Sequence, residues 1–211
     1  MKHPRLQILF ALFIALLIGM NLLGSKITTL VGISVSVGIF MVPLTFLITD
    51  IVEEVYGKST VKYFIIGGVL SLAVTFLFTS LFVILEPHER YSFNEEYRTI
   101  FGSSLRIIIA SITAFALAQV HDVFAFEWWK KKTHGRALWL RNNLSTFVSQ
   151  FIDTMAFMMI AFWQITPKFT FAFILSLAIP YYIFKIVFAV IDTPLVYLGV
   201  RWLRAEKEKS S

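Results

Sequence analysis

The chain has 211 residues, of which 57% are hydrophobic, 16% aromatic and only 15% charged, and it carries a net charge of +6 with a mean hydropathy of +0.76. This composition excludes an ordinary soluble domain and an intrinsically disordered chain, because both are far more polar. The chain contains no cysteine, which excludes disulfides, thiolate chemistry and cysteine-ligated metals.

Apolar segments of membrane-spanning length recur along the whole chain, about 20 residues being needed for each helix. We therefore predict an all-α integral membrane protein, with one domain over residues 1–211 and six transmembrane helices. The predicted spans cover residues 6–24, 34–51, 61–85, 104–126, 142–163 and 171–200. The first span resembles a secretory signal, but no Ala-x-Ala-like cleavage site follows it, so we expect an uncleaved helix.

The basic residues are distributed unevenly over this predicted topology. The outer segments hold only Lys26, Arg90, Arg98 and Lys168. The inner segments hold a larger set: Lys2, Arg5, Lys58, Lys62, Lys130, Lys131, Lys132, Arg136, Arg141, Arg201, Arg204, Lys207 and Lys209. This positive-inside bias predicts that both termini are cytoplasmic. Topology and anionic headgroups then explain the basic runs, and a nucleic-acid groove is not indicated.

Small residues line one side of the first predicted helix, where Ala11, Ala15 and Gly19 repeat at four-residue spacing. Such a seam lets another helix approach closely. We expect it to pack against a helix of the same bundle. The alternative is a docking face, either for a second copy of the chain or for an ATPase partner.

The second predicted helix contains Pro43, which removes a backbone donor and is expected to kink the helix and expose carbonyls to a cavity. Asp50, Glu53 and Glu54 follow near its cytoplasmic end. We expect the two glutamates to meet water and pair with nearby lysines, whereas Asp50 lies deeper and is a candidate site residue. Further along, residues 93–101 have the amphipathic spacing of an outer interfacial helix.

The fourth predicted helix carries Arg106, Gln119 and Asp122. Arg106 is close enough to the outer boundary to extend its charge into the headgroups. Gln119 and Asp122 are too deep for that explanation and are candidate site residues. His121 is about 100° around the helix from Asp122, and we expect no serine partner for it.

The fifth predicted helix has the clearest polar stripe. Asn143, Thr146, Gln150 and Asp153 step by three, four and three residues and therefore share one face, which Phe157 continues. A carboxylate near the bilayer centre costs roughly 2.5–3.5 kcal/mol on insertion scales. The stripe therefore predicts a polar site inside the membrane. The alternative is interhelical hydrogen bonding alone, which is the preferred interpretation for Thr146.

The last predicted helix contains Pro180, Lys185 and Asp192. Lys185 falls near the middle of the membrane, where an ammonium group requires a carboxylate partner. Asp153 and Asp192 are both suitably placed to pair with it. Such a pair could belong to the site or be purely structural.

Enzyme signatures are missing from the sequence, which has no HExxH, GxSxG, P-loop or dinucleotide motif and no cluster of metal ligands. We therefore predict a protein that is not an enzyme and has no cofactor. An intramembrane enzyme that depends on His121 and a structural scaffold without a saturable ligand are the remaining alternative classes.

Several short motifs together resemble a known family. They are N-L-L-G-S-K at 21–26, F-L-I-T-D at 46–50, Y-G at 56–57, R-I-I-I-A-S at 106–111, A-L-A-Q-V-H-D-V at 116–123, N-N-L-S-T-F-V-S-Q-F-I-D-T at 142–154, A-F-W at 161–163 and F-K at 184–185. They resemble the queuosine-precursor transporters, also called the vitamin uptake transporter family, of bacterial inner membranes. The resemblance covers nearly the whole chain. It implies a six-helix importer of a 7-deazaguanine, a purine-like base used in tRNA modification.

The polar residues suit such a substrate, which offers an N1–H and an exocyclic amine as donors and a carbonyl as an acceptor. A carboxylate can accept from both donors, so Asp153 is the first candidate for this edge, with Gln150 beside it and Asn143 on the same stripe. Lys185, Arg106 or Gln119 would bind the acceptor atoms of the substrate. Asp122 or Asp50 would bind a cationic aminomethyl group in substrates that carry one. Trp163 or Phe157 would stack on the rings.

The leading hypothesis is thus a transporter that works by alternating access, with Pro43, Pro180 and Gly67–Gly68 as possible points of flexure. The alternative hypothesis is a substrate-binding membrane subunit of an ATPase-energised vitamin uptake complex.

Overall fold

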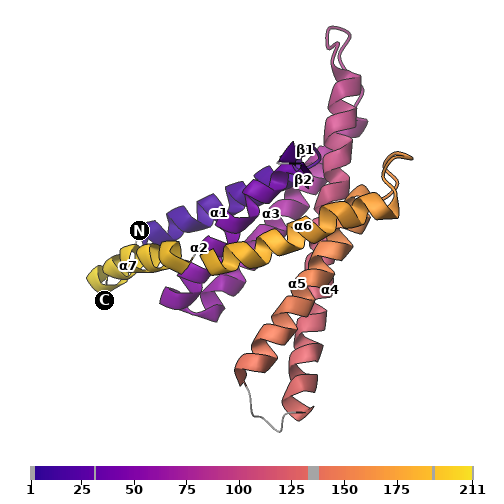
Figure 1. Ribbon diagram of the computed structural model, residues 1–211. Coiled ribbons are helices and arrows are strands. Elements are labelled where there is room, and N and C mark those ends of the chain that lie inside the picture. The colour runs from indigo at the N-terminus through magenta and orange to yellow at the C-terminus, as the bar shows by residue number, and fades with distance from the viewer. Residues whose placement is uncertain (1–2, 31, 133–137, 192, 211) are drawn as a thin grey trace.

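The computed structural model describes residues 3–30, 32–132, 138–191 and 193–210. The chain is almost entirely helical, with one short β-hairpin after the first helix (Figure 1). In chain order the elements are α1 (Pro4–Leu23), β1 (Ile27–Leu30), β2 (Ile33–Ser36), the 3-10 helix η1 (Val37–Phe40), α2 (Val42–Tyr56), α3 (Lys58–Ile84), α4 (Asn94–Lys132), α5 (Leu138–Phe162), α6 (Phe171–Ile191) and α7 (Thr193–Ser210).

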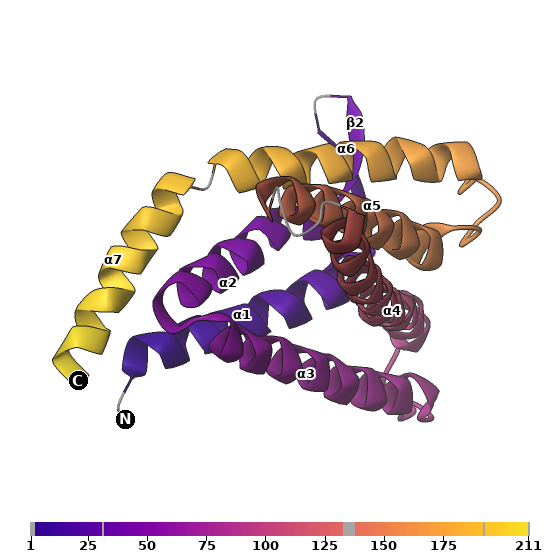
Figure 2. The same ribbon diagram turned by 90° about the horizontal axis from the view of Figure 1, so that it is seen from below.

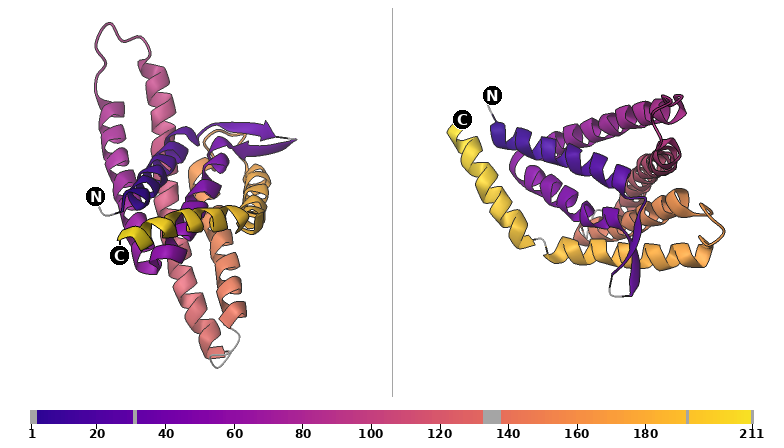
Figure 3. Two further views of the ribbon diagram at one scale, coloured as in Figure 1. Left: turned by 90° about the vertical axis from the view of Figure 1, so that its left-hand side faces the viewer. Right: turned by 90° about the horizontal axis from the view of Figure 1, so that it is seen from above.

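The helices form two groups that meet at the hairpin end of α1. Helices α1, α2, α3 and α7 pack together on one side, and α4 and α5 form a long antiparallel pair across which α6 lies (Figures 1 and 2). The antiparallel hairpin β1–β2 pairs Ile27 with Ser36 and Leu30 with Ile33. It contacts α6, and its tip projects beyond the helices (Figure 3).

Four helices within the described residues are long and apolar enough to cross a membrane: α1, α3, α4 over Asn94–Ala118 and α6 over Phe171–Phe188. In α5 the apolar stretch Phe147–Phe162 is shorter. Helix α3 shows how these helices meet lipid, since Ile66, Leu70 and Leu77 share one face and are 54–64% exposed. An apolar helical face of that kind requires a hydrocarbon environment. The protein is therefore an all-α membrane protein.

Helices α1, α3 and α5 lie within a few residues of the ranges predicted from sequence, but the second predicted helix was wrong in its first half. Residues 34–40 belong to β2 and η1, and α2 begins only at Val42. Pro43 therefore stands in the first turn of α2, where its missing N–H has no intrahelical acceptor to lose. It starts the helix and does not kink it.

Two other predicted elements also differ from the structure. The predicted helix over residues 171–200 is divided, with α6 ending at Ile191 and α7 beginning at Thr193. Pro194 explains the division, because its ring would clash with the carbonyl four residues earlier in a continuous helix. The predicted interfacial helix over 93–101 is the first part of α4, which continues without a break to Lys132. At about 1.5 Å per residue, its 39 residues span about 58 Å, well beyond the hydrocarbon thickness.

The small-residue seam of α1 does not make the contact expected of it. Ala11 and Ala15 are exposed, and only Gly19 packs closely, against the Met41 side chain. The close approach of α1 and α3 instead uses Gly67 and Gly68 of α3. Large side chains of α1 (Phe10, Phe13 and Leu17) lie over these two glycines.

Helix α7 is fixed against both α1 and α2. The Glu206 carboxylate accepts from the backbone N–H of Arg5 at 2.9 Å, which places a negative charge at the N-terminus of α1. Arg204 pairs with Glu54 at 2.7 Å. The two ends of the chain therefore lie side by side, as Figure 2 shows.

Because α7 packs closely on α2, we predict that adding one methyl group at Gly199 lowers the stability of the protein. A Cβ at Gly199 would lie 2.2 Å from Cδ1 of Ile51 and 2.7 Å from its Cγ1, and Ile51 is only 6% exposed. We expect Gly199→Ala to destabilise the protein by about 1–3 kcal/mol through overpacking, measured as a lower thermal unfolding temperature in detergent.

The matched control is Gly102→Ala in α4, where a Cβ would meet no atom within 4 Å, so no loss is expected. Combining Gly199→Ala with Ile51→Val should recover part of the lost stability. An unchanged unfolding temperature in Gly199→Ala would show that α7 does not pack closely on α2.

Candidate functional site

A cavity of about 440 Å³ lies among helices α1 to α6, and its walls include residues of both helix groups. Its polar lining residues are Asn21, Ser36, Thr45, Thr49, Glu53, Ser111, Ser149, Gln150, Asp153, Thr154, Tyr181 and Lys185. Apolar side chains complete the wall, among them Phe46, Phe115 and Phe157. The volume lies within the usual range for pockets that hold a small organic ligand, roughly 300–1,000 Å³.

An ion pair joins α5 to α6 at the wall of this cavity. Lys185 Nζ donates to Asp153 Oδ2 at 2.7 Å, and the side chains are 7% and 25% exposed. The ammonium also lies 6.0 Å from the ring centre of Phe46 and 5.6 Å from that of Tyr181, within the range of a cation–π contact. The expected pairing of Lys185 with Asp153 is confirmed, and Asp192 lies outside the described residues.

One face of α5 supplies most of the polar groups that the cavity contains. Four residues of this face line the cavity: Gln150, Asp153, Thr154 and Phe157. Relative to Gln150, the other three follow at positions +3, +4 and +7, which lie on one side of a helix. Within the part of the chain that the structure describes, Gln150 Oε1 and Thr154 Oγ1 are buried without a hydrogen-bond partner. Buried polar atoms of this kind are unusual and costly. This face of α5 therefore presents unpaired acceptor groups at the cavity wall.

An aromatic wall stands beside this polar face. The Phe157 ring lies 6.5 Å from the ring of Tyr181, with the two planes 26° apart. Both rings line the cavity. A planar heterocycle held by the polar face of α5 would have these rings as neighbours.

Hydrogen bonds join the elements that line the end of the cavity near the hairpin. Asn21 is fully buried, donates to the Leu17 carbonyl at 2.8 Å, and accepts from Ser111 Oγ of α4 at 2.7 Å. Ser36 donates to the Gly24 carbonyl at 2.6 Å and accepts from Gly38 N–H at 3.2 Å. These contacts hold the end of α1, the hairpin and α4 together.

The cavity also extends to the last turns of α2, where an exposed carboxylate lies at its wall. It reaches Thr49 and Glu53 in the last turns of α2, and the Glu53 carboxylate is 45% exposed and 3.9 Å from Lys58. Ser149 also lines the cavity, and its hydroxyl lies 3.0 Å from His121 Nδ1. The expectation that His121 has no serine partner was wrong, because α4 and α5 pack with these residues facing each other.

Three residues proposed from sequence lie elsewhere. Arg106 donates to the backbone carbonyls of Ile160 at 2.6 Å and Trp163 at 2.5 Å, so it satisfies the last carbonyls of α5. Trp163 is 42% exposed just after that helix. Asp50 is on the exposed side of α2. None of the three lines the cavity.

For Gln119, Asp122 and Asn143 the structure describes only the backbone, which belongs to α4 and α5, and not the side chains. Sequence reasoning missed Asn21, Ser111 and Thr154 as cavity residues. A signal for the first two was present, since an amide and a hydroxyl stand out in otherwise apolar helices. Thr154 carried no such signal, because only the structure shows that its hydroxyl has no hydrogen-bond partner within the described chain.

A multi-pass helical membrane protein with polar groups in the wall of an internal cavity has the architecture of a carrier for a small solute. Residues 36–199 match the model of a family described as "Putative vitamin uptake transporter", and the chain belongs to this family.

Two curated proteins are similar to most of the chain. The "Probable queuosine precursor transporter" of Bacillus subtilis (strain 168) is 29% identical over 192 residues, which cover 90% of this chain and 82% of that protein. The "Queuosine precursor transporter" of Escherichia coli (strain K12) is 27% identical over 172 residues, covering 81% and 75% respectively. No solved structure matches the chain.

The ion pair predicts a clear pattern of stability and uptake. Lys185→Met leaves the Asp153 carboxylate without its buried partner and should destabilise the protein by up to about 3–5 kcal/mol. The double variant Lys185→Met/Asp153→Leu removes both charges and should recover much of that loss. Thermal unfolding of the purified variants measures both effects.

Uptake separates a binding role from a structural one. If the pair contributes to the site, the double variant is stable but inactive. Normal uptake by the double variant would show that the pair only holds α5 and α6 together.

Proposed function

We propose that this protein imports a queuosine precursor, a 7-deazaguanine-type base, across the bacterial inner membrane for tRNA modification. Membership of the transporter family supports transport, and the names of both curated relatives support the substrate class. The observation that carries the proposal is the polar face of α5 inside the cavity, where an ion pair stands beside unpaired amide and hydroxyl groups.

The chemistry of this face suits a neutral base with two adjacent donors. A carboxylate has about four acceptor positions, so Asp153 can hold Lys185 and still accept from an N1–H and an exocyclic amine. Gln150 offers another acceptor one turn away. Because Lys185 balances the charge of Asp153, the site can bind an uncharged ring without leaving a bare charge in the membrane. Phe157 and Tyr181 would contact the faces of the ring.

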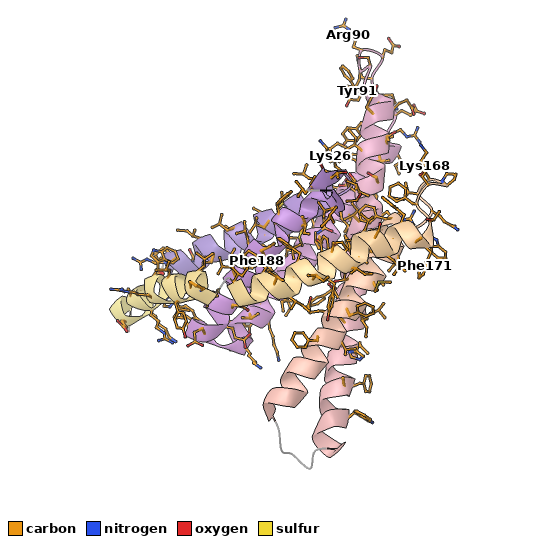
Figure 4. All side chains as sticks on the ribbon, viewed as in Figure 1. Lys26, Arg90, Tyr91, Lys168, Phe171 and Phe188 are labelled. Atoms are coloured by element: carbon orange, nitrogen blue, oxygen red, sulfur yellow. The ribbon has the colours of Figure 1, made fainter. Side chains whose placement is uncertain are left out.

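Our proposed topology has six crossings, α1 to α6, with both termini and α7 on the cytoplasmic side. The hydrogen bonds from Arg5 to Glu206 support an even number of crossings, because they hold the two ends of the chain together. Residues 37–56 form η1 and α2 and span about 30 Å at the helical rise. Lys26, Arg90 and Lys168, which belong to the predicted outer segments, lie far from the termini (Figure 4).

In this topology the cavity is closed outward and open inward. Asn21, Ser111 and Ser36 close the outer end, and the half-exposed Glu53 marks the inner mouth. Transport would alternate this conformation with one in which the contact between α1 and α4 is broken. The family and the relatives' names favour a transporter over an intramembrane enzyme or a subunit that requires an ATPase.

Uptake by the purified chain in liposomes tests the function directly. We expect saturable, time-dependent accumulation of radiolabelled 7-deazaguanine without ATP or a partner protein. Asp153→Asn should reduce this uptake at least tenfold, because an amide accepts fewer hydrogen bonds and presents its own donors to the donor edge. Asp50→Asn is the control, since Asp50 does not line the cavity.

Failure of the liposomes to accumulate the base, together with ATPase-dependent uptake in cells, would favour the energised complex. Absence of any saturable binding would contradict the proposed function itself.

Cross-linking tests the proposed outer closure. Asn21 and Ser111 are in contact at 2.7 Å, and the chain has no cysteine, so an Asn21→Cys/Ser111→Cys pair supplies its only thiols. A short bifunctional methanethiosulfonate should join them and stop uptake, and a reductant should restore it. Each single cysteine variant is the control. Full uptake by the cross-linked protein would show that α1 and α4 need not separate.

A further inference from the structure

We infer that Thr154 is a specificity-determining contact of this cavity, and that its hydroxyl binds the substrate ring beside the edge held by Asp153 and Gln150. This inference rests on the proposed function and deepens it. It assigns the site to rings with a 2-amino-4-oxopyrimidine edge, in which two donors stand next to ring or carbonyl acceptors.

The lack of a hydrogen-bond partner within the described chain sets the buried hydroxyl of Thr154 apart from the other buried hydroxyl groups in these helices. Its side chain is 1% exposed, and Oγ1 has no hydrogen-bond partner within the described chain. Thr45, Thr49 and Ser71 show the usual arrangement, since each donates to a carbonyl three or four residues earlier in its own helix at 2.7–2.8 Å. That local bond is the normal way for a membrane helix to satisfy a buried hydroxyl. Thr154 does not use it.

The surroundings of Thr154 explain what the free hydroxyl can do. It follows Asp153 directly and is one helical turn from Gln150, and all three residues line the same cavity. Asp153 already has Lys185 as a partner, whereas the buried oxygens of Gln150 and Thr154 have none among the residues that the structure describes. The groups that still lack hydrogen bonds are therefore the uncharged ones, Gln150 and Thr154. A bound ligand would supply those hydrogen bonds.

The hydrogen-bonding character of the three groups matches one class of ring edge. The carboxylate and the amide oxygen accept hydrogen bonds, so they require adjacent N–H donors on the ligand. The threonine hydroxyl can donate to an acceptor next to those donors. A ring with a lactam N–H and a neighbouring amine meets both requirements. A ring without the amine leaves a buried acceptor unpaired, which sites of this type discriminate against strongly.

The test compares two isosteric substitutions in the same cavity. Thr154→Val removes only the unpaired hydroxyl, whereas Thr45→Val, the control, removes a hydroxyl that is satisfied by the Val42 carbonyl at 2.7 Å. Both threonines are buried and line the cavity. Binding of 7-deazaguanine and of 7-deazahypoxanthine, which lacks the amine, is measured by titration of the purified full-length protein.

We expect Thr154→Val to weaken binding of 7-deazaguanine about two- to thirteenfold, in line with the loss of one ordinary hydrogen bond, and to leave the unfolding temperature of the ligand-free protein unchanged or higher. Thr45→Val should bind like the wild type. The wild type should prefer 7-deazaguanine to 7-deazahypoxanthine, and Thr154→Ser should retain most of the affinity. If Thr154→Val does not fold, Thr154→Ser against Thr154→Ala gives the same comparison.

The inference is overturned if Thr154→Val binds as tightly as the wild type, or if it loses stability without ligand while keeping its affinity. In those cases the wild-type protein still binds 7-deazaguanine and the proposed function stands. If the wild type binds neither base, the proposed function fails and the inference fails with it.

Discussion

The buried ion pair of Lys185 with Asp153 is the interaction that constrains how the helices of this protein are arranged. An ammonium and a carboxylate inside a bilayer are each costly to bury, and only their pairing makes the burial tolerable. The 2.7 Å contact between them fixes α6 against α5. The rings of Phe46 and Tyr181 beside the ammonium bring α2 to the same point. A cavity can exist there because the charges neutralise each other and leave acceptor positions on Asp153 facing inward.

The two ends of the cavity are built on different principles. Near the hairpin, every polar side chain described above has a partner, so Asn21, Ser36 and Ser111 make a hydrogen-bonded junction. At the end of α2, a half-exposed carboxylate replaces this network. Helix α7 holds α2 from outside, through the pair of Arg204 with Glu54 and the tight contact at Gly199. The same helix binds the start of α1 and therefore connects that end of α1 with the last turns of α2.

Much of this architecture follows from the sequence because the bilayer makes hydrophobic length decisive. The helical membrane class and the approximate limits of α1, α3 and α5 need only runs of apolar residues. The stripe of Gln150, Asp153 and Phe157 needs only the helical period, and the unpaired charge of Lys185 required a carboxylate. Hydropathy could not distinguish an apolar hairpin and 3-10 turn from a helix over residues 34–41. It also gave no weight to Pro194, where one apolar run becomes two helices.

The sequence by itself thus determined the class of protein, the periodic face of α5 and the need for a buried ion pair, since these depend on local composition and spacing. The tertiary structure alone decided which residues face one another. It directed Arg106 to the end of α5, joined Asn21 to Ser111, and left the Thr154 hydroxyl without a partner. The physical reason is that hydrogen bonds between distant helices depend on their relative position and rotation, which the packing of all side chains sets together and no single segment encodes.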